Sequence, residues 1–333
     1  LDEALAELEH YVAVDMYITE TTRHAHVILP PVSHLERSDV DFVFPAVSVH
    51  NHIRPNPAAV PPPPDGRTDW QILWALAGRL GGGLAGRIQN GLVSLVGAVA
   101  TPERIGDLAL RTGPYGLLAR GPFGSLTMGK VKESVHGIDL GPLQPRLASL
   151  MRTPKKRLRL TTPALLAAAE ELEALAAERE MAAESGFDLT LIGRRQLRSN
   201  NSWMHNSPRL MKGADRCTAI LHPDDASARG ISEGDNVRVA SRVGAIEVPV
   251  EISDEIRPGV VSVPHGFGHT RAGVGWKGAA AKAGASMNDI TDASVVDALS
   301  GNAAFNAVAV RIEPIAGGDA DATRDVASEP TAA

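Results

Sequence analysis

The basic, amide-rich stretch from Gly193 to Asn206 contains the residue types in this sequence that best fit binding chemistry. Between Leu189 and Ala214 there are five Arg or Lys residues and no Asp or Glu, although the formal net charge of the chain is -6. Guanidinium groups suit phosphates or carboxylates, Asn and Ser side chains both donate and accept hydrogen bonds, and Trp203 offers a flat face. The stretch predicts a site for a large, anionic, ring-bearing ligand, with a solvated basic loop as the alternative.

Other residues with possible chemistry are histidines and one cysteine. His24 and His26 share a strand face and could hold a metal with His34, but no spaced carboxylate or cysteine pattern accompanies them. His265 and His269 flank glycines at the end of an expected strand, where a backbone can approach a ligand closely; a plain loop is the alternative. Cys217, at the start of an expected strand, favours a buried structural thiol over an activated one.

Composition narrows the class of protein. A length of 333 residues with 44% hydrophobic content predicts two globular domains, and the pI near 6 argues against nucleic-acid binding. The single cysteine excludes internal disulfides and fits a reducing, cytoplasmic location. No run of about eighteen apolar residues is present, so no membrane span is expected. Residues 1–10 are acidic and unlike a signal peptide, and we expect the natural N-terminus to lie upstream.

Two short apolar runs near the start predict neighbouring parallel strands. Tyr11–Tyr17 contains Asp15 near its carboxyl end, where α/β folds place ligands, and His26–Leu29 is stopped by two prolines. The connection between them is very short. This pattern predicts the edge of a doubly wound α/β sheet.

Proline, glycine and helix-capping residues indicate where the elements in the middle of the chain begin and end. We expect a polar ordered loop over 33–56 and an extended proline-rich segment over 54–64. Thr68 should cap a helix that Gly81–Gly83 end, and residues to about 150 are weakly helical with Gly-Pro turns. Thr162-Pro163 should start a helix that runs to Glu184.

Past Gly186 the pattern changes to short strands. One small helix is expected at 223–230, and the strands are expected at 187–192, 217–221, 236–240, 246–252, 259–263 and 308–312. Pro249 would remove a ladder donor, so its strand is expected at an edge or bulge. Together these strands predict a compact β-barrel, followed by a disordered tail after Glu313.

An ordered series of loose motifs runs through the whole sequence. Its members are Val14–Thr21, Val27–Pro30, Leu35–Arg37, Asp69-Trp70, Ile192–Arg194, His222–Ala226, Met287–Thr291 and Leu299–Asn302. In order and spacing, residues 11–313 resemble the C-terminal half of the molybdopterin oxidoreductases. These are the bis-molybdopterin-guanine-dinucleotide enzymes related to formate dehydrogenases and to periplasmic or assimilatory nitrate reductases.

The resemblance implies an α/β plus β fold with four parts. Residues 1–85 would end a doubly wound α/β molybdopterin oxidoreductase domain, and residues 86–186 would form a helical or irregular connection. Residues 187–313 would form a double-psi β-barrel that caps the cofactor, and residues 314–333 a disordered tail. Some relatives carry Glu-x-x-Gly where this chain has Glu36–Asp39 without the glycine, so this loop can turn differently.

The resemblance also assigns cofactor contacts by position. Asp15 and Asp69 would accept the N–H groups of guanine edges, and Arg37 sits where the family often has Lys. His265 and Asn288 would contact the pterins, and Asn306 sits where a relative has Lys. The segment implied to wrap pyrophosphate and pterin consists of Ile192, Gly193, Arg194, Arg195, Gln196, Leu197, Arg198, Ser199, Asn200 and Asn201. No catalytic residue and no metal ligand is assigned, and Cys217 does not fall at the family's metal position.

The activity implied by the resemblance belongs to a longer chain. The whole protein would move two electrons between a small-molecule substrate at Mo or W and a 4Fe-4S cluster, whose ligands we expect in an N-terminal half that also supplies the metal ligand. This part alone would be inactive; an electron-transfer partner is possible, whereas a nucleic-acid partner is not expected. Arg194→Ala in the full-length protein is expected to lower molybdenum occupancy. The alternatives are a non-enzymatic double-psi barrel module that binds a nucleotide or protein, and a hydrolase that uses His24, His26 and His34.

Overall fold

The computed structural model describes residues 1–80, 83–117, 125–145, 147–297 and 299–315. The chain divides into two compact units, Leu1–Leu158 and Arg159–Ala333, and each is considered by itself. The finer division at residues 86, 187 and 314 stays a prediction, and the expected disordered tail falls almost wholly outside the described residues.

The first unit begins with helix α1 (Asp2–Ala6) and a pair of very short strands, β1 (Val12–Ala13) and β2 (Val27–Ile28). They pair in parallel, with Val12 opposite Val27, and the turn η1 (Thr22–His24) lies between them. The predicted parallel pair with a short crossover is therefore confirmed. Asp15 follows β1 after one intervening residue, close to the carboxyl end of this parallel strand.

The prediction of a loop over residues 33–56 is wrong. This segment contains the turn η2 (Phe44–Val47) and the strands β3 (Asp39–Val40), β4 (His50–Ile53) and β5 (Pro55–Asn56). Strand β3 pairs with β5, and β4 pairs with β6 (Ile138–Pro142), which the sequence pattern did not indicate. Because β4 and β6 lie far apart along the chain, no local pattern could reveal their pairing.

Helix α2 (Asp69–Ala77) begins where the sequence predicts. Thr68 and Gln71 form a capping box, in which each side chain accepts a hydrogen bond from the other residue's backbone N–H. The expected end at Gly81–Gly83 is wrong, because the helix ends at Ala77 and Gly83 starts the next helix. The remaining helical elements of this unit are α3 (Gly83–Val99), α4 (Pro102–Thr112), α5 (Met128–Glu133), α6 (Leu147–Leu150) and the turn η3 (Pro154–Lys156).

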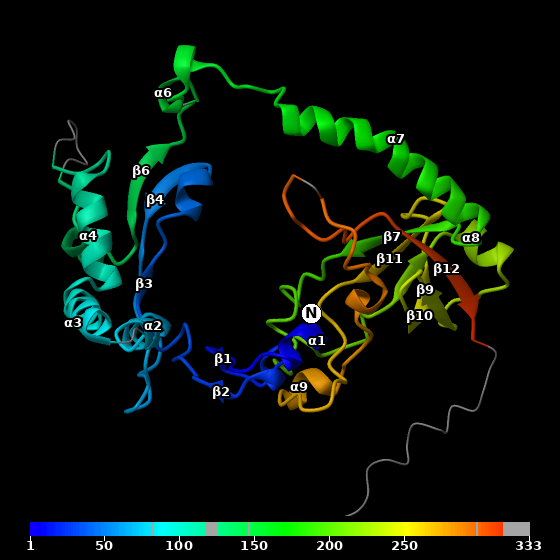
Figure 1. The fold of residues 1–333 in the computed structure, drawn as a ribbon, viewed down its shortest axis with the longest axis horizontal. Helices are drawn as coiled ribbons and strands as arrows, with labels where there is room; N and C mark the ends of the chain where they lie inside the picture. Colours follow the sequence, from blue (N-terminus) through cyan, green and yellow to red (C-terminus); the bar gives the residue numbers. More distant parts are fainter. Residues whose placement is uncertain (81–82, 118–124, 146, 298, 316–333) are drawn as a thin grey trace, which may run out of the picture. The chain divides into compact units, whose positions relative to one another are not determined.

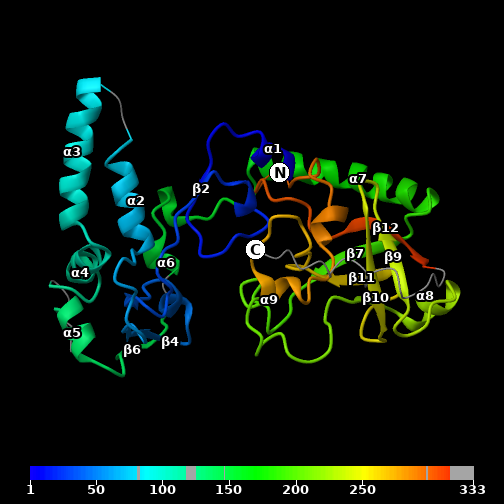
Figure 2. The same ribbon diagram turned by 90° about the horizontal axis from the view of Figure 1, so that it is seen from below.

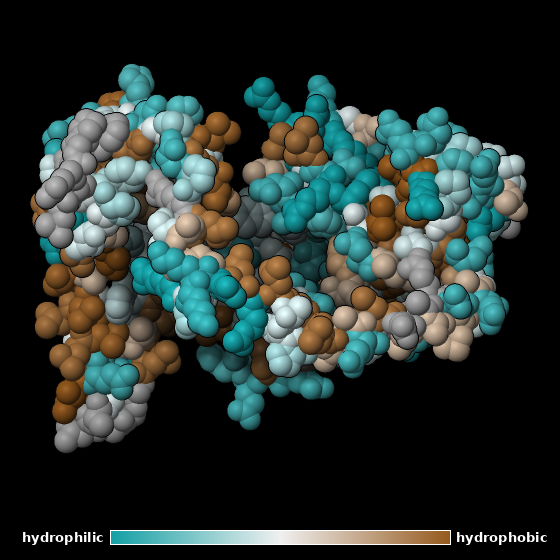
Figure 3. Space-filling view, turned by 90° about the horizontal axis from the view of Figure 1, so that it is seen from above, coloured by the Kyte–Doolittle hydropathy of each residue, from teal (hydrophilic) through white to brown (hydrophobic). Residues whose placement is uncertain are grey.

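The helices of the first unit leave much apolar surface uncovered. Ile88, Leu92 and Leu95 of α3 are each about 60% exposed. Apolar side chains gather toward the lower left of the space-filling view, over α2 and α3 (Figure 3). The buried cluster of this unit is small and centres on Ile53, Leu126, Met128 and Val131.

The second unit opens with α7 (Pro163–Glu184), which has the predicted bounds. The Thr162 hydroxyl accepts a hydrogen bond from Leu165 N, and Pro163 occupies the first helical position. Its other helical elements are α8 (Pro223–Ala228), α9 (Lys277–Ala280) and the turn η4 (Met287–Ile290).

Six strands of the second unit close into a barrel in the order β10-β8-β11-β7-β12-β9. Figures 1 and 2 show β7, β9, β10, β11 and β12 of this barrel grouped together. Their bounds are β7 (Leu189–Arg194), β8 (Ala219–Leu221), β9 (Asn236–Ala240), β10 (Ala245–Ile252), β11 (Val260–Pro264) and β12 (Val308–Pro314). The pairs β10–β8 and β11–β7 are parallel, whereas the other four are antiparallel. The predicted compact barrel is confirmed.

Pro249 does not lie on a sheet edge, because the barrel is closed. Val250 N donates to Asp235 O beside β9, and successive N–H groups of a strand point in opposite directions. The nitrogen of Pro249 therefore faces β8, whose register with β10 begins only at Val250 opposite Ala219. The missing N–H of Pro249 therefore removes no hydrogen bond between β10 and β8.

The barrel encloses the main hydrophobic core. Leu191, Val237, Val239, Val261 and Val310 have no exposed surface. Each such side chain contributes about 1.5–3 kcal/mol of burial, so the core supports loops that are rich in polar residues. Among the described residues, no helix combines the length and the apolar character needed to cross a membrane.

Candidate functional site

The strap, which we define as residues 193–206, leaves the barrel at the end of β7. Gly193 N donates a hydrogen bond to Asn306 Oδ1 over 2.8 Å, so two predicted site residues are in contact. A methyl group added at Gly193 would lie 3.2 Å from the Phe305 ring and 3.4 Å from Met287. The absence of a side chain therefore lets the strap start close to the loops beside it.

Arg194 is held inside the barrel end by its guanidinium group. Its Nη1 donates to Ser262 O over 2.6 Å, and its Nη2 donates to Thr218 Oγ1 over 2.6 Å and to Arg216 O over 3.3 Å. Burial lowers the pKa of Arg194, while the nearby Glu251 carboxylate opposes that shift. These contacts give Arg194 a structural role, and its contact with a cofactor stays a prediction.

The backbone of the strap turns sharply at Asn200 and Asn201. Their φ angles are 44° and 62°, in the left-handed region that Asn tolerates better than most residues. Within the part of the chain that the structure describes, no hydrogen bond to protein uses the backbone N–H groups of Asn200, Asn201 and Ser202. Adjacent N–H groups without protein acceptors can bind an anion, as they do in phosphate-binding loops.

Asn201 joins the strap to the loop that follows β11. Its Oδ1 accepts a hydrogen bond from Arg195 Nη1 over 2.7 Å and lies 3.0 Å from His265 Nε2. Burial lowers the pKa of His265, and the positive charge of Arg195 lowers it further. His265 is therefore biased toward the neutral form, in which a ring N–H can donate to Asn201.

The loop after β11 lies against the strap through a glycine. Gly266 has a φ of 92°, and a methyl group there would come within 2.3 Å of Asn201 O. No L-residue would fit this position without displacing the strap. The strap and the loop therefore form one packed surface at this end of the barrel.

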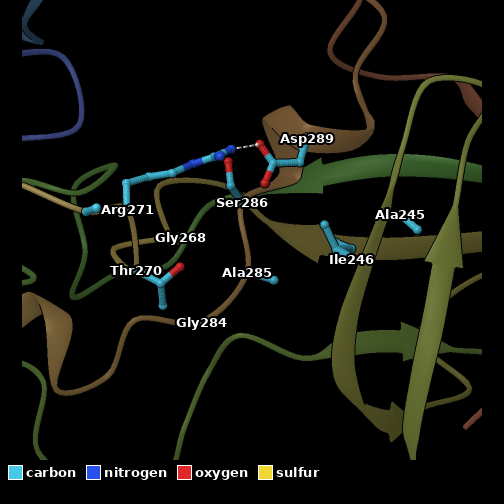
Figure 4. A pocket seen from close by; sticks show the side chains of 10 residues that line it. Ala245, Ile246, Gly268, Thr270, Arg271, Gly284, Ala285, Ser286 and Asp289 are labelled. Carbon is cyan, nitrogen blue, oxygen red and sulfur yellow. Dashed lines mark hydrogen bonds and ion pairs between the residues drawn. The ribbon is translucent and has the colours of Figure 1, made fainter. Parts of the chain in front are cut away.

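A cavity of about 440 Å³ opens beside the same loop, between β10 and η4 (Figure 4). Arg271 and Asp289 form an ion pair of 2.7 Å at this cavity, and Ser286 lies next to the Arg271 guanidinium (Figure 4). Asn288, which the sequence singles out, does not line the cavity. Its backbone oxygen accepts a hydrogen bond from Thr291 N.

The remaining predicted contacts in and next to the strap differ in exposure. Arg198 and Asn200 are exposed, and Leu197 is 99% exposed. Ile192 lies partly exposed on β7, and Gln196 is half-buried. Ser199 differs from them, because it is only 1% exposed and its hydroxyl lies against His205. Contacts of these residues with a cofactor stay predictions.

The other predicted contacts lie in the first unit. Arg37 Nη1 and Asp69 Oδ1 form an ion pair of 3.0 Å, and Asp69 also accepts a hydrogen bond from Trp70 N. Asp15 Oδ1 accepts a hydrogen bond from Tyr17 N. The structure thus brings Arg37 and Asp69 together, while no hydrogen bond or ion pair within the described residues joins Asp15 to them.

The histidines considered for a metal have other partners. His24 Nε2 lies 2.5 Å from Asp2 Oδ1, and His26 Nδ1 accepts a hydrogen bond from Tyr11 N. Across the described ranges, no group of three His, Cys, Asp or Glu side chains is arranged to hold a metal ion. The hydrolase alternative therefore receives no support.

The sequence placed His205 and Asn206 in the predicted binding stretch and offered His269 as a possible ligand contact, but it gave none of the three a structural role, and it did not indicate Thr218. His205 of the strap and His269 of the loop after β11 are buried, and Asn206 Oδ1 accepts hydrogen bonds from Gly278 N and Ala279 N at the start of α9. Thr218 bridges Arg194 to Glu251. The sequence signal that could have indicated these residues was their type, because two histidines and several amide side chains occur together in these loops.

Two family profiles match the chain. "Molydopterin dinucleotide binding domain" covers residues 189–309, and "Molybdopterin oxidoreductase" covers residues 1–79. The dimethyl sulfoxide/trimethylamine N-oxide reductase of Cereibacter sphaeroides is 25% identical over 285 residues, which are 79% of this chain and 33% of that protein. The assimilatory nitrate reductase catalytic subunit of Bacillus subtilis is 37% identical over 81 residues, which are 24% of this chain and 11% of that protein.

A solved structure matches nearly the whole chain. Acetylene hydratase from Pelobacter acetylenicus aligns with a TM-score of 0.55 and 18% identity, over 94% of this chain and 41% of that one. The chain spans about a third of the length of the long-aligning curated relatives. Because both profiles fall on the units that carry the predicted motifs, the expected family is confirmed, and the chain belongs to the molybdopterin oxidoreductases.

Proposed function

We propose that this chain is the cofactor-holding C-terminal part of a molybdopterin-dependent oxidoreductase that acts on a small-molecule substrate. The whole protein would carry out a two-electron reaction of the nitrate reductase or formate dehydrogenase kind. In this proposal the barrel is a double-psi barrel. The cofactor is bis-molybdopterin guanine dinucleotide with Mo or W, and electrons pass to a 4Fe-4S cluster held elsewhere in the protein.

The observation that carries this proposal is the outward-facing turn of the strap. The N–H groups of Asn200, Asn201 and Ser202 have no acceptor within the described residues, and the exposed Arg198 lies in the same short segment. Unpaired N–H groups and guanidinium groups suit the pyrophosphate of a dinucleotide. The donor set therefore fits the cofactor that the family implies.

Each group of residues has a distinct task in the proposal. The strap amides and Arg198 bind phosphate, whereas His265, Asn201 and Asn288 offer polar groups to pterin edges. Asp15 and Asp69 offer carboxylates to guanine, and Arg37 orients Asp69 through their ion pair. Redox chemistry at the metal is what the bound cofactor would supply, while the protein supplies binding and orientation.

The reductases among the relatives favour this proposal over a non-enzymatic barrel module. A cytoplasmic location also remains a proposal, which rests on the single cysteine. Mo and W suit the described residues equally, because none of them is proposed as a metal ligand.

Pterin content tests the proposal more cleanly than the metal content of Arg194→Ala, because Arg194 also holds the barrel end together. Arg198→Gln in the full-length protein should lower bound pterin at least about fivefold, since each charge-assisted hydrogen bond to phosphate is worth about 1 kcal/mol or more. The measurement is fluorescent pterin released per protein, with elemental analysis for Mo and W.

Arg209→Gln is the matched control. It removes the same charge from an exposed residue of the same basic segment, just beyond the strap. Unchanged pterin in Arg198→Gln, or an equal loss in both variants, would remove the strap from the proposed site.

A further inference from the structure

A series of buried hydrogen bonds links two residues of the strap, Ser199 and His205, to His269 in the loop after β11. Ser199 Oγ lies 2.8 Å from His205 Nε2, and His205 Nδ1 lies 2.8 Å from His269 Nε2. Ser199, His205 and His269 are 1%, 0% and 3% exposed. Polar groups are costly to bury, so three linked polar side chains at one place indicate a specific task.

Aromatic rings pack against both histidines of this hydrogen-bonded series. The His205 ring packs on Phe267 with centroids 4.4 Å apart, and the His269 ring meets Trp276 edge-on at 4.7 Å. These rings keep water away from the hydrogen bonds, which strengthens each bond and raises the cost of breaking one.

The protons of the chain can be ordered in only two neutral ways. A neutral imidazole carries one ring N–H and one acceptor nitrogen. Either Ser199 donates to His205 and His205 donates to His269, or every proton points the other way. In both orders the two hydrogen bonds form together, so the three side chains act as one unit.

This unit connects the turn of the strap to the loop after β11. Ser199 immediately precedes the left-handed residues Asn200 and Asn201, and its backbone oxygen accepts a hydrogen bond from Met204 N over 3.1 Å. His269 lies in the loop that also carries Gly266, against which Asn201 packs. Non-glycine residues keep a left-handed conformation where surrounding contacts hold them. The hydrogen bonds of Ser199, His205 and His269 supply such contacts on the buried side of the turn.

We propose that Ser199, His205 and His269 are positioning residues that hold the strap turn with its N–H groups directed outward. This role rests on the proposed function insofar as those groups bind the cofactor. It also assigns the Ser199 side chain an internal task in place of a ligand contact.

Hydrogen exchange of the full-length protein tests the positioning directly. Ser199→Ala should speed exchange of the amides of Met204 and His205 about tenfold relative to the core amides of β9 and β11, the effect of losing one buried hydrogen bond. His205→Phe, which keeps an aromatic ring against Phe267, should have at least the same effect. Phe267→Leu is the control, because it weakens the ring packing and leaves the hydrogen bonds in place.

A double-mutant cycle separates a linked chain from ordinary packing. Ser199 and His269 are connected through His205, so the combined change Ser199→Ala with His269→Phe should cost much less than the sum of the single changes. Additive effects, or a Ser199→Ala variant whose strap exchanges at the parent rate, would overturn the proposal.

Pterin content distinguishes this proposal from the proposed function. We expect Ser199→Ala to lower bound pterin in the full-length protein while its barrel amides remain protected. If Ser199→Ala loosens the strap but keeps its pterin, while Arg198→Gln loses pterin, then the positioning role for the cofactor is wrong and the proposed function still stands. If neither variant loses pterin, the proposed function fails, and faster strap exchange would still support the positioning of the strap.

Discussion

The barrel of the second unit and the helical part of the first unit both contain many apolar residues but bury them very differently. Leu191, Val239 and Val261 have no exposed surface, whereas Ile88, Leu92 and Leu95 of α3 are each about 60% exposed. The barrel closes on itself, so each strand finds two partners within the unit. Within its described residues, the first unit has only two-stranded sheets, which bury little on their own.

The same contrast applies to the proposed cofactor contacts. In the second unit, Arg194 is anchored by hydrogen bonds to Ser262, Thr218 and Arg216 inside the barrel end. In the first unit, Arg37 and Asp69 form one ion pair with 34% and 46% of their side chains exposed. Arg194 is therefore fixed by several partners next to the closed core, whereas Arg37 and Asp69 are held by a single, partly exposed ion pair.

Core truncation should give the largest difference between the units. Leu191→Ala should lower the free energy of unfolding by about 2–5 kcal/mol, because it leaves a cavity in the closed barrel. Leu92→Ala, at a leucine that is 58% exposed, should change it by about 0.5 kcal/mol or less. Denaturant unfolding of each variant measures both values, and equal losses would contradict the contrast in burial.

Removal of the two arginines should give the next difference. Arg194→Ala should cost about 2–4 kcal/mol, because three carbonyl or hydroxyl acceptors at the barrel end lose their donor. Arg37→Ala removes a half-exposed ion pair and should cost about 0–1 kcal/mol. Thermal unfolding compares the two, and a larger loss for Arg37→Ala would reverse the assignment of Arg194 as an anchor.

The smallest expected effect is a pH dependence at His265. Burial and Arg195 lower the pKa of His265 in the folded protein, so the folded state binds a proton less readily than the unfolded chain. The resulting stability is present above the pKa of the unfolded histidine and is lost as pH falls through the lowered pKa.

Two variants test this dependence. His265→Gln should lose less stability than the parent between neutral and acidic pH, as measured by thermal unfolding. Arg195→Gln should raise the pKa of His265 toward its ordinary value, because one of its two causes is removed. A His265 titration that is unchanged in Arg195→Gln would show that the two side chains do not interact.

The barrel was predictable because its information is local. The alternation of Ile246, Val248 and Val250 with polar residues defines β10, and Asn236–Ala240 has the same bounds in the sequence prediction and in the structure. Thr162-Pro163 likewise fixed the start of α7 through capping chemistry alone. In contrast, β6 was missed and β4 was interpreted as loop, because each becomes a strand only by pairing with the other.

The sequence by itself determined that residues 193–206 are basic, amide-rich and free of acidic groups, and its ordered motifs predicted the family that the profiles confirm. Only the tertiary structure decided how these residues divide their tasks. Arg194 and Ser199 face inward to Thr218 and His205, whereas Arg198 and Asn200 face outward. The physical reason is that residue type sets which hydrogen bonds a side chain can form, while barrel closure and the loop at Gly266 set which partners are within reach.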